Sequence, residues 1–476
     1  MGNIKKNIGY NLLYRLVLII LPLITSPYIA RTLGAYSVGV YSFTNSVAYY
    51  FFLFSMLGVN NYGNREIAKV RDDKVKLSET FWQIYYMQWF LSIIMTIIYI
   101  TGVMHVGKEY LLVSLLQSLC VISAATDINW FAYGLEEFRF STFWSSTLKI
   151  ITALCYFIFI KQPSDLWKYT FILQFGNIVS LLPIWILVKQ YTIFQKPNFR
   201  IIRKHIRPNL ILFLPLVASS LYQYMDRIMI GLFTKKDEVG YYNYAENILS
   251  IPVQLTAAVG TVMLPHISNL VVTHNKERSI EILFLFLKYV SWLNIGLSFG
   301  MAAVAKTFIP WYLGSGFQRS AQLLAVLCPV IVINGIADVL RTQYLIPNSR
   351  DTLFTVSICA GALLNLLLNI VLIPKMFGMG ASIATIAAYF SQLIIQIFKT
   401  KNELNYSQFF REIIPFVISG FVMYLFVSFL SKIISQPLFV SLLIQVSLGG
   451  ILYFVLTMCW MYFVQHDQRL LDVLKH

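Results

Sequence analysis

The sequence predicts an all-α polytopic membrane protein, with about fourteen transmembrane helices arranged as two parallel-repeat six-helix lobes followed by two C-terminal helices. Three observations predict this fold class. Of the 476 residues, 58% are apolar and only 12% are charged, whereas the charged share of a soluble domain is about 25%. Long apolar runs recur along the whole chain, and a short motif of the first half returns in the second.

The apolar runs meet the length of about 20 residues that a helix needs to cross a bilayer. The connections between them are too short for an extramembrane domain of about 50 residues or more, so any binding site must lie within the membrane. The first run lacks a small-residue cleavage site, which indicates a retained helix and not a signal peptide. The expected spans are 8–33, 39–62, 81–104, 110–133, 142–160, 168–188, 208–233, 240–265, 282–304, 320–342, 352–373, 379–398, 413–431 and 438–464.

The basic residues predict the orientation. An even number of spans puts both termini on one side, and cytoplasmic loops carry an excess of Lys and Arg. With the N-terminus inside, the inner segments hold most of the 37 Lys and Arg residues, and the strongest inner loops are 65–76 and 189–207. Both termini are therefore expected in the cytoplasm. The same loops account for the net charge of +16, so no nucleic-acid partner is expected.

Two sequence echoes relate the halves. Residues 38–43 (VGVYSF) return as residues 239–244 (VGYYNY), and the helix before each copy carries Leu-Pro-Leu and then Arg31 or Arg227. Both echoes pair a span with the sixth span after it, in the same orientation, so the repeats are parallel. Such repeats usually form two bundles that rock about a central site, which favours a secondary transporter. In the second echo, Asp127, Tyr133 and Arg139 match Asp338, Tyr344 and Arg350.

The longest polar connection falls between the sixth and seventh spans and marks the expected boundary between the lobes. The predicted organisation is an N-lobe at 1–190, a basic cytoplasmic linker at 191–207, a C-lobe at 208–400, and the last two spans with the cytoplasmic C-terminus at 401–476.

Ionisable residues inside a membrane are costly and mark a pathway unless they have a partner or can reach the interface. Arg15, Lys149 and Lys288 lie about 10 Å from an inner end, so snorkelling to the headgroups is an equal alternative; the same holds for Arg31 at the outer interface. By depth, Arg31, Asp226, Arg227 and Glu246 form an outer layer, and Arg15, Asp127, Lys149, Lys288, Asp338 and Arg341 form an inner one.

The intramembrane acids are the ion-coupling candidates. Asp226 and Arg227 diverge by about 100° on one helix, so at least one needs a partner on another span. Asp338 and Arg341 are three residues apart and can pair with each other. Glu246 stands where the first repeat has Asn45, and it could exchange a proton, bind Na⁺ or pair with Arg227. The candidates are Glu246, Asp226, Asp127 and Asp338.

Prolines concentrate in the spans that carry the echoes. We expect them to break these helices, because non-helical backbone at membrane depth is tolerated where it is buried or lines water. Spans one, two, seven and eight are therefore predicted to form the cavity wall and the moving parts; kinks for packing are the alternative. The prolines are Pro22, Pro27, Pro215, Pro252 and Pro265.

The sequence contains no motif for nucleotide hydrolysis, zinc binding or a nucleophile elbow. The five cysteines are odd in number and lack paired spacing, so neither disulfides nor a metal are indicated. We expect no enzyme activity and no cofactor, and transport driven by an ion gradient or by substrate flow.

Several segments resemble the bacterial Wzx-type polysaccharide-export flippases, which transport lipid-linked oligosaccharides. The resemblance covers almost the whole chain. It rests on Asn11, residues 21–34 (LPLITSPYIARTLG), 38–43 (VGVYSF), 57–58 (LG), 62–68 (YGNREIA), 127–131 (DINWF), 134–136 (GLE), 225–231 (MDRIMIG), 239–242 (VGYY) and 263–268 (MLPHIS).

The resemblance implies a fold shared with the multidrug-extrusion (MATE) and peptidoglycan-precursor (MurJ) transporters, in which two six-helix lobes form a V around a central cavity. It implies the substrate, an undecaprenyl-diphosphate-linked oligosaccharide, transferred from the inner to the outer leaflet of a bacterial cell membrane, and association with polysaccharide polymerase machinery. The arginine that ends the first span is common in relatives, so Arg31 is expected to contact diphosphate or an acidic sugar.

A diphosphate crossing the bilayer needs a basic, hydrated cavity, and arginine suits phosphate by its fork of donors. The expected headgroup contacts are Arg31, Arg227, Lys149, Lys288, Arg15 and Arg341. Two alternatives remain: a small-molecule or drug antiporter of the same fold, which would favour an acidic cavity, and a membrane polysaccharide polymerase, which would carry a large outer loop with clustered acids or histidines.

Overall fold

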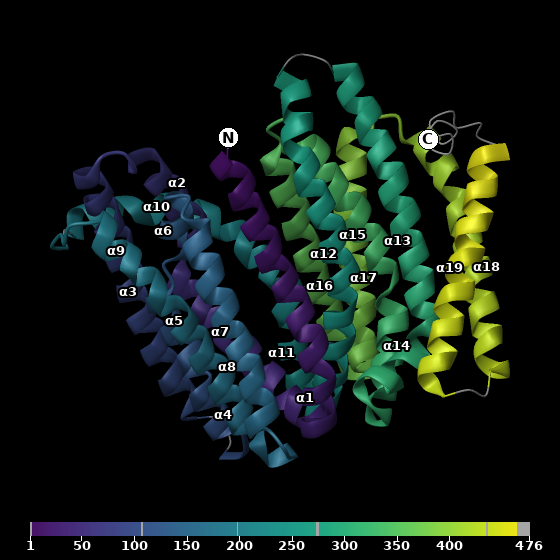
Figure 1. Ribbon diagram of the computed structural model, residues 1–476, viewed down its shortest axis with the longest axis horizontal. Coiled ribbons are helices and arrows are strands. Elements are labelled where there is room, and N and C mark those ends of the chain that lie inside the picture. Colours follow the sequence, from purple (N-terminus) through teal and green to yellow (C-terminus); the bar gives the residue numbers. More distant parts are fainter. Residues whose placement is uncertain (1, 106–107, 198, 273–275, 435–436, 464–476) are drawn as a thin grey trace. The chain divides into compact units, whose positions relative to one another are not determined.

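The computed structural model describes residues 2–105, 108–197, 199–272, 276–434 and 437–463, which form helices and no β-strand (Figure 1). The predicted all-α class is therefore confirmed for the described residues. The helices overlap every range that the sequence predicts as a span. By length and composition, nine described helices can each cross a membrane, or ten when the pair Ser315–Leu327 and Pro329–Leu345, bent by 43°, counts as one span. The count of fourteen stays a prediction.

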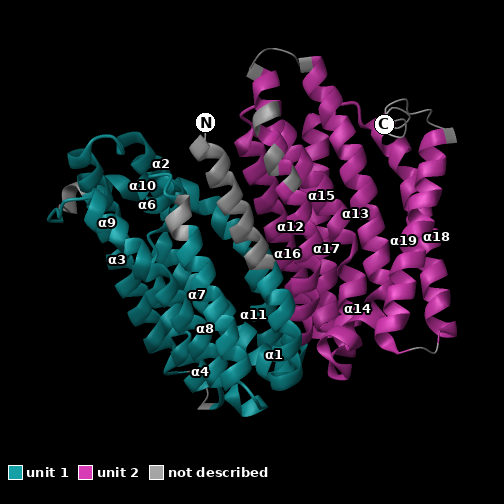
Figure 2. Ribbon diagram, viewed as in Figure 1, with its two compact units in different colours: residues 1–240 teal, residues 241–476 magenta. Residues whose placement is uncertain are grey.

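The chain divides into two compact units, Met1–Gly240 and Tyr241–His476 (Figure 2). The first unit includes residues 208–240, which the predicted lobe boundary assigns to the second repeat. The boundary between functional lobes stays a prediction.

The first unit contains eleven helices in its described residues and the start of a twelfth. Short 3₁₀ turns η1 (Lys108–Tyr110), η2 (Pro163–Asp165) and η3 (Leu182–Ile184) and a π-helical turn, η4 (Leu221–Met225), join some of them. The helices are α1 (Gly2–Met56), α2 (Val59–Val70), α3 (Lys74–Val103), α4 (Leu111–Leu116), α5 (Ser118–Thr126), α6 (Asn129–Gly134), α7 (Phe138–Phe159), α8 (Leu166–Leu181), α9 (Trp185–Tyr191), α10 (Phe199–Ser220) and α11 (Asp226–Phe233).

The second unit is built from longer helices. A 3₁₀ turn η5 (Ser315–Phe317) precedes α14, and a second π-helical turn, η6 (Arg341–Leu345), follows α15. Its helices are α12 (Lys236–Val272), which begins in the first unit, α13 (Lys276–Leu313), α14 (Gln318–Leu327), α15 (Pro329–Leu340), α16 (Asp351–Met376), α17 (Gly378–Thr400), α18 (Tyr406–Ile433) and α19 (Leu438–Phe463).

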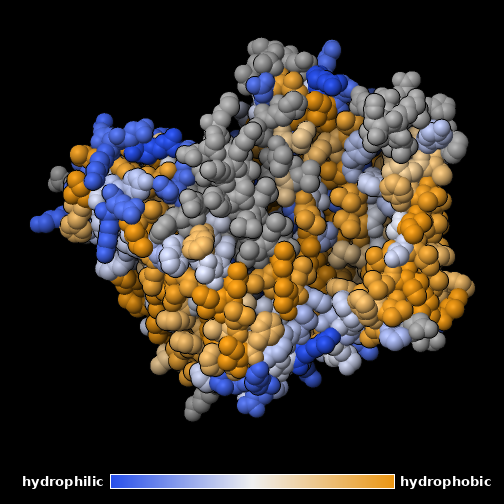
Figure 3. All heavy atoms as spheres, in the orientation of Figure 1, coloured by the Kyte–Doolittle hydropathy of each residue, from blue (hydrophilic) through white to orange (hydrophobic). Residues whose placement is uncertain are grey.

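Each unit has a buried apolar core near its predicted inner end. In the first unit the core gathers Phe81, Trp130 and Phe131 from α3 and α6. In the second it gathers Leu283, Leu340 and residues of α17 and α18. The flank of the first unit is apolar, and hydrophilic side chains gather at its two ends, near α2 and near α4 (Figure 3). An apolar flank between two hydrophilic ends is the surface that a protein needs in order to span a lipid bilayer.

Candidate functional site

The helix break of the first repeat lies at a glycine, not at the prolines. α1 is interrupted at Gly34, with φ 77° and ψ 170°, a conformation that glycine adopts at low cost. This break separates the predicted spans 8–33 and 39–62. The expectation that the prolines break helices is wrong for Pro22, Pro27 and Pro215, which lie inside α1 and α10. Neighbouring helices and local adjustments can satisfy the backbone groups that proline frees.

α12 likewise runs through Pro252 and Pro265 as one helix, Lys236–Val272. The backbone departs from α-helical geometry nearby, at the π-helical turn η4 between α10 and α11. π-helical turns are rare in proteins, and those that occur are frequently located at functional sites. Because η4 ends directly before Asp226 and Arg227, it sets the direction of the two charged residues that the sequence singles out.

The two echo motifs meet at their glycines. A Cβ atom on Gly39 would lie 1.7 Å from the carbonyl oxygen of Lys236, and one on Gly240 would lie 2.1 Å from the carbonyl oxygen of Ala35. No side chain fits at such distances. The second part of α1 and the start of α12 therefore cross backbone against backbone, and both glycines are needed for this crossing.

A cation and an aromatic ring extend the crossing. The Nζ atom of Lys236 lies 3.6 Å from the ring centroid of Phe43 and donates a hydrogen bond to the carbonyl oxygen of Gly231. A Cβ atom on Gly231 would lie 2.2 Å from the Phe43 ring. Phe43 is the last residue of the first echo motif, so the motif marks the contact surface between α1, α11 and α12.

Asp226 and Arg227 lie beside a tyrosine stack. Asp226 is 0% exposed and Arg227 is half-buried. The Arg227 guanidinium lies 5.8 Å from the ring centroid of Tyr224, and that ring stacks on Tyr49 at 3.8 Å with an interplanar angle of 13°. The half-buried rings of Tyr49 and Tyr224 thus lie next to a guanidinium, an arrangement that joins a flat aromatic surface to an anion-binding group.

A chain of side-chain amides, which sequence reasoning missed, runs through the first unit. The amide of Gln174 donates to Gln117 (2.7 Å) and to Asn45 (3.2 Å), and Gln117 donates to Thr44 (3.5 Å). Gln117 and Gln174 are buried, and the Oε1 atom of Gln174 has no hydrogen-bond partner in the structure. Glutamines inside apolar runs were the signal that could have revealed this chain.

Three further tyrosines, from α1, α7 and α8, pack against one another in the first unit. Tyr169 packs against Tyr41 with ring centroids 4.9 Å apart and against Tyr156 at 5.3 Å. Tyr41 and Tyr49 are two turns apart on α1, and Thr44 and Asn45 of the amide chain lie between them in sequence, so both groups have members on this helix. Sequence reasoning did not single out this group.

The predicted basic contacts of the first unit differ in their surroundings. Arg31 is exposed near the end of the first part of α1, and Lys149 is half-buried on α7. Arg15 lies on α1, but its side chain is outside the described residues. Arg31 and Arg227 thus have accessible surface.

The acids of the second echo have structural partners. The Oδ1 atom of Asp127 accepts from the backbone and the side chain of Asn129 (3.0 and 2.7 Å) at the break between α5 and α6. Its repeat mate Asp338 accepts from Arg341 at 3.0 Å (Nε) and 2.5 Å (Nη2). Asp338 and Arg341 therefore form the ion pair with each other that their spacing in the sequence allows.

Lys288 is 7% exposed on α13, and its Nζ atom lies 4.0 Å from Glu412 on α18. Glu246 is half-buried on α12. In the described part of the chain, no group of three or more His, Cys, Asp or Glu side chains is arranged to hold a metal ion.

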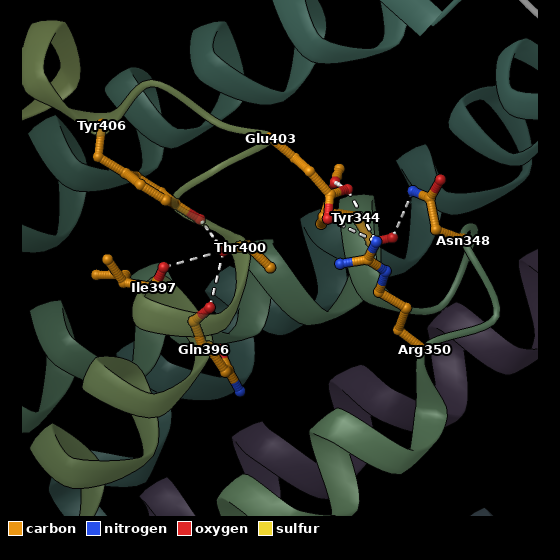
Figure 4. A network of polar contacts seen from close by, with 8 residues as sticks. All are labelled: Tyr344, Asn348, Arg350, Gln396, Ile397, Thr400, Glu403 and Tyr406. Carbon is orange, nitrogen blue, oxygen red and sulfur yellow. Dashed lines mark hydrogen bonds and ion pairs between the residues drawn. The ribbon is translucent and has the colours of Figure 1, made fainter.

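The remaining residues of the second echo join a network at the predicted inner end of the second unit (Figure 4). The Glu403 carboxylate accepts from the Tyr344 hydroxyl (2.5 Å) and from the Arg350 guanidinium (2.7 and 2.9 Å). The hydrogen bond that Arg350 donates to Glu403 raises the pKa of Arg350. Tyr344 and Arg350 thus tie η6 to the turn after α17. Of the matching residues in the first unit, Arg139 has its side chain outside the described residues.

Comparisons with known proteins agree with this architecture. The model of the family described as "Polysaccharide biosynthesis protein" matches residues 4–271. A protein of Escherichia coli (strain K12), named as a candidate O-antigen transporter, is 24% identical over 396 residues, which cover 81% of this chain and 95% of that protein.

Among solved structures, the fold is similar to that of the lipid II flippase MurJ in an inward closed conformation, with a TM-score of 0.76 and 17% identity over 95% of this chain and 99% of that one. It is also similar to an inward-facing multidrug resistance MATE transporter of the MOP superfamily, with a TM-score of 0.62 and 12% identity over 82% and 95% of the two chains. Because the family model covers more than half of the sequence, this multi-pass membrane protein belongs to the polysaccharide biosynthesis protein family.

Proposed function

We propose that the protein moves an undecaprenyl-diphosphate-linked oligosaccharide repeat unit from the cytoplasmic to the outer leaflet of a bacterial cell membrane by alternating access. The family match and the O-antigen relative support the substrate class. The residues for this activity lie on α1, α7, α11 and α12, and both termini face the cytoplasm. Capsule, O-antigen or another surface polysaccharide would be built from the exported unit.

The observation that carries the proposal is the stack of Tyr49 and Tyr224 with the Arg227 guanidinium beside it. A lipid-linked oligosaccharide presents the apolar faces of sugar rings, many hydroxyl groups and a diphosphate. Aromatic rings suit the sugar faces, the amides of Gln117 and Gln174 suit hydroxyl groups, and guanidinium suits the diphosphate.

Basic residues would compensate the charge of the diphosphate as it crosses the membrane, because an unpaired anion in hydrocarbon is strongly unfavourable. In this scheme Lys149 and Arg15 admit the headgroup from the inner side, and Arg227 and Arg31 receive it toward the outer side. Arg341 and Lys288 are left out of the path, because each lies beside a carboxylate, Asp338 or Glu412.

Movement would centre on the crossing of Gly39 and Gly240. In this scheme the crossing would close the outer end of the path, because helices in backbone contact leave no passage between them. Opening requires α1 and α12 to separate at the two glycines while the inner ends come together. Gly34, directly before the crossing, supplies backbone freedom for such a change.

Coupling to H⁺ or Na⁺ would use Asp226 and Glu246. A buried carboxylate is sensitive to ion occupancy because its charged form lacks hydration. At Asp127 and Asp338, an ion would have to replace the hydrogen bond from Asn129 and the ion pair with Arg341. Delivery of the exported unit would place the protein close to polysaccharide polymerase machinery.

The test is the double variant Arg31→Ala/Arg227→Ala. Each lost charge-assisted contact weakens binding by roughly tenfold or more, so we expect surface polysaccharide to disappear while protein abundance in the membrane stays normal. In liposomes, the variant should not flip a fluorescent undecaprenyl-diphosphate sugar that the wild type flips. The matched control is Lys306→Ala/Lys375→Ala, which removes two exposed charges. Normal export by the arginine variant would refute the proposal.

A further inference from the structure

An apolar pocket lies within the second unit, where α13 packs against α18 and α19 (Figure 1). Its volume is about 350 Å³, which falls in the range of small-molecule sites. Glycines and aromatic rings form much of its wall, and no charged side chain is among the described residues that line it. Nothing in the proposed transport path uses this pocket.

One polar side chain in the wall of the pocket is left without a partner. Gln445 of α19 is 1% exposed and lines the pocket, and its Oε1 atom has no hydrogen-bond partner among the described residues. A buried amide oxygen in this state is costly, because it has lost its hydrogen bonds to water. Since the amide also carries N–H donors, a hydroxyl group, which both donates and accepts, complements it.

Two glycines leave space in the pocket that no neighbouring side chain fills. In the described part of the chain, a Cβ atom on Gly450 would meet nothing within 4 Å, and one on Gly300 would meet only the Met423 Cε atom, at 3.7 Å. Packing explains the other two glycines of the wall, because Cβ atoms on Gly296 and Gly449 would lie 2.6 and 2.7 Å from side chains. Glycine inside a helix is less favourable than alanine, so Gly300 and Gly450 have another role, and they keep the pocket open.

The pocket runs along the helices inside the hydrocarbon part of the membrane. In the predicted orientation α19 begins at the outer side, so Gln445 lies about 10 Å below the start of that helix. Phe454, at the other end of the lining on α19, is about 14 Å farther along the axis. A slim chain can follow this path to a side chain that is 1% exposed, whereas a second helix, about 10 Å across, cannot reach it.

The chemistry of the wall selects one class of ligand. A phosphate at this depth would be strongly unfavourable without a cation, and the described residues of the wall supply none. A plain hydrocarbon chain would leave the Gln445 oxygen without a partner. A lipid with a hydroxyl group and no charge meets both conditions.

We propose that this pocket binds an uncharged lipid alcohol, with the hydroxyl group at the Gln445 amide and the hydrocarbon chain along Gly300 and Gly450. Diacylglycerols and long-chain alcohols share this chemistry. The bound lipid fills the space between α13 and α19 and fastens α19, which lies outside the predicted repeats, to α13. The proposal does not depend on the transported substrate.

The test uses the purified full-length protein, stripped of lipid in detergent, with binding followed by native mass spectrometry and thermal midpoint. The probes are dioleoylglycerol, oleyl alcohol, the methyl ether of each, and dioleoylphosphatidic acid. We expect at least one alcohol to bind about fivefold tighter than its methyl ether, which cannot donate a hydrogen bond, and the tighter alcohol identifies the source. Phosphatidic acid should bind more weakly than that alcohol. Equal binding of alcohols and ethers, or tighter binding of phosphatidic acid, would overturn the proposal.

Variants separate the polar end of the site from its chain-binding part. Gln445→Leu should keep the chain bound but remove the preference for an alcohol over its ether. Without lipid, its thermal midpoint should be no lower than that of the wild type, because leucine replaces an unsatisfied amide. Gly450→Leu fills the open space and should weaken binding of every probe by about fivefold or more. The control Gly102→Leu, at an equally open glycine of α3, should bind as the wild type does.

Three results with these variants would contradict the assignment. They are an unchanged preference in Gln445→Leu, unchanged binding in Gly450→Leu, and a lipid-free dimer that Gly450→Leu dissociates, which would show a protein partner in the pocket. Should Gln445→Leu fail to fold, the probe series on the wild type and Gly450→Leu decide.

Discussion

The two ends of the first unit are held together in different ways. At the predicted outer end, α1 and α12 touch through the backbone at Gly39 and Gly240, where a Cβ atom would lie within about 2 Å of a carbonyl oxygen. At the inner end, the Tyr62 hydroxyl and the ring of His205 are 2.7 Å apart, and His205 contacts Gln83 at 3.0 Å. The backbones there pass at a looser distance, since a Cβ on Gly58 would be 3.0 Å from the Asn209 carbonyl oxygen.

Further polar side chains hold the inner end. Arg71 pairs with Glu136 at 2.6 Å, and the Tyr191 hydroxyl donates to Glu137 at 2.8 Å. The difference teaches that the close approach of α1 and α12 requires residues without side chains at Gly39 and Gly240, so one added methyl group disrupts it. The inner contacts depend on hydrogen bonds and charge, so they respond to pH and to loss of single partners. Under the proposed alternating access, the inner contacts would form and break during transport.

The largest effect is expected from Gly39→Ala. A methyl group cannot share space with the Lys236 carbonyl oxygen, so α1 and α12 must move apart, at a cost of about 3 kcal/mol. Flipping in liposomes should fall to background, and the thermal midpoint should drop. Gly102→Ala is the matched control, because its Cβ meets nothing within 4 Å. Equal behaviour of the two variants would show that the crossing is not a tight contact.

The next effect is expected from Gln88→Leu at the inner end. Gln88 is 0% exposed, donates to the Asp127 carbonyl oxygen at 2.8 Å and accepts from the Trp130 indole at 2.9 Å. Leucine leaves these groups buried without that partner, which should lower the free energy of unfolding by roughly 2 kcal/mol. Denaturation in detergent measures the loss. Gln190→Leu, at an exposed glutamine of α9, should change little; a similar loss there would contradict the assignment.

A smaller, pH-dependent effect is expected at His205. Burial lowers the pKa of His205 below its usual value of 6.5, and Glu66 partly offsets this. The unfolded chain therefore binds a proton at a pH where the folded chain does not, so the stability from this site is present above about pH 6.5 and is lost as the pH falls toward the lowered pKa. Between pH 7.5 and 5.5 the thermal midpoint of the wild type should fall more than that of His205→Gln. Parallel curves would contradict the sign of the shift.

The smallest effect is expected from Asp73→Ala at the start of α3. The Asp73 carboxylate accepts from the backbone amides of Val75 and Lys76 and pairs with the Lys76 side chain, and these contacts lower the pKa of Asp73. This exposed cap therefore stabilises the helix above about pH 3.9 and stops doing so as the pH falls further. Asp73→Asn should keep most of the thermal midpoint at pH 7, whereas Asp73→Ala should lose slightly more. A loss larger than that of Gln88→Leu would reverse the expected order.

The sequence predicted the helices well, because membrane spans are set by the length of an apolar run, and a described helix overlaps every expected range. The repeated motif also pointed to Gly39 and Gly240 of the crossing. The sequence could not show, however, that these glycines lie against Lys236 and Ala35. The amide chain of Gln117 and Gln174 and the tyrosine stack escaped notice, because polar residues spaced along different helices share no pattern in one dimension.

The sequence by itself determined that this is a multi-pass helical membrane protein with related halves, because the bilayer imposes length, apolarity and charge bias residue by residue. Only the tertiary structure decided which polar groups meet. It paired Asp338 with Arg341, set Lys288 beside Glu412 and aligned Tyr49 with Tyr224. The reason is physical: a hydrogen bond or a stack requires atoms within a few ångströms, and that distance depends on how helices far apart in sequence rotate and cross.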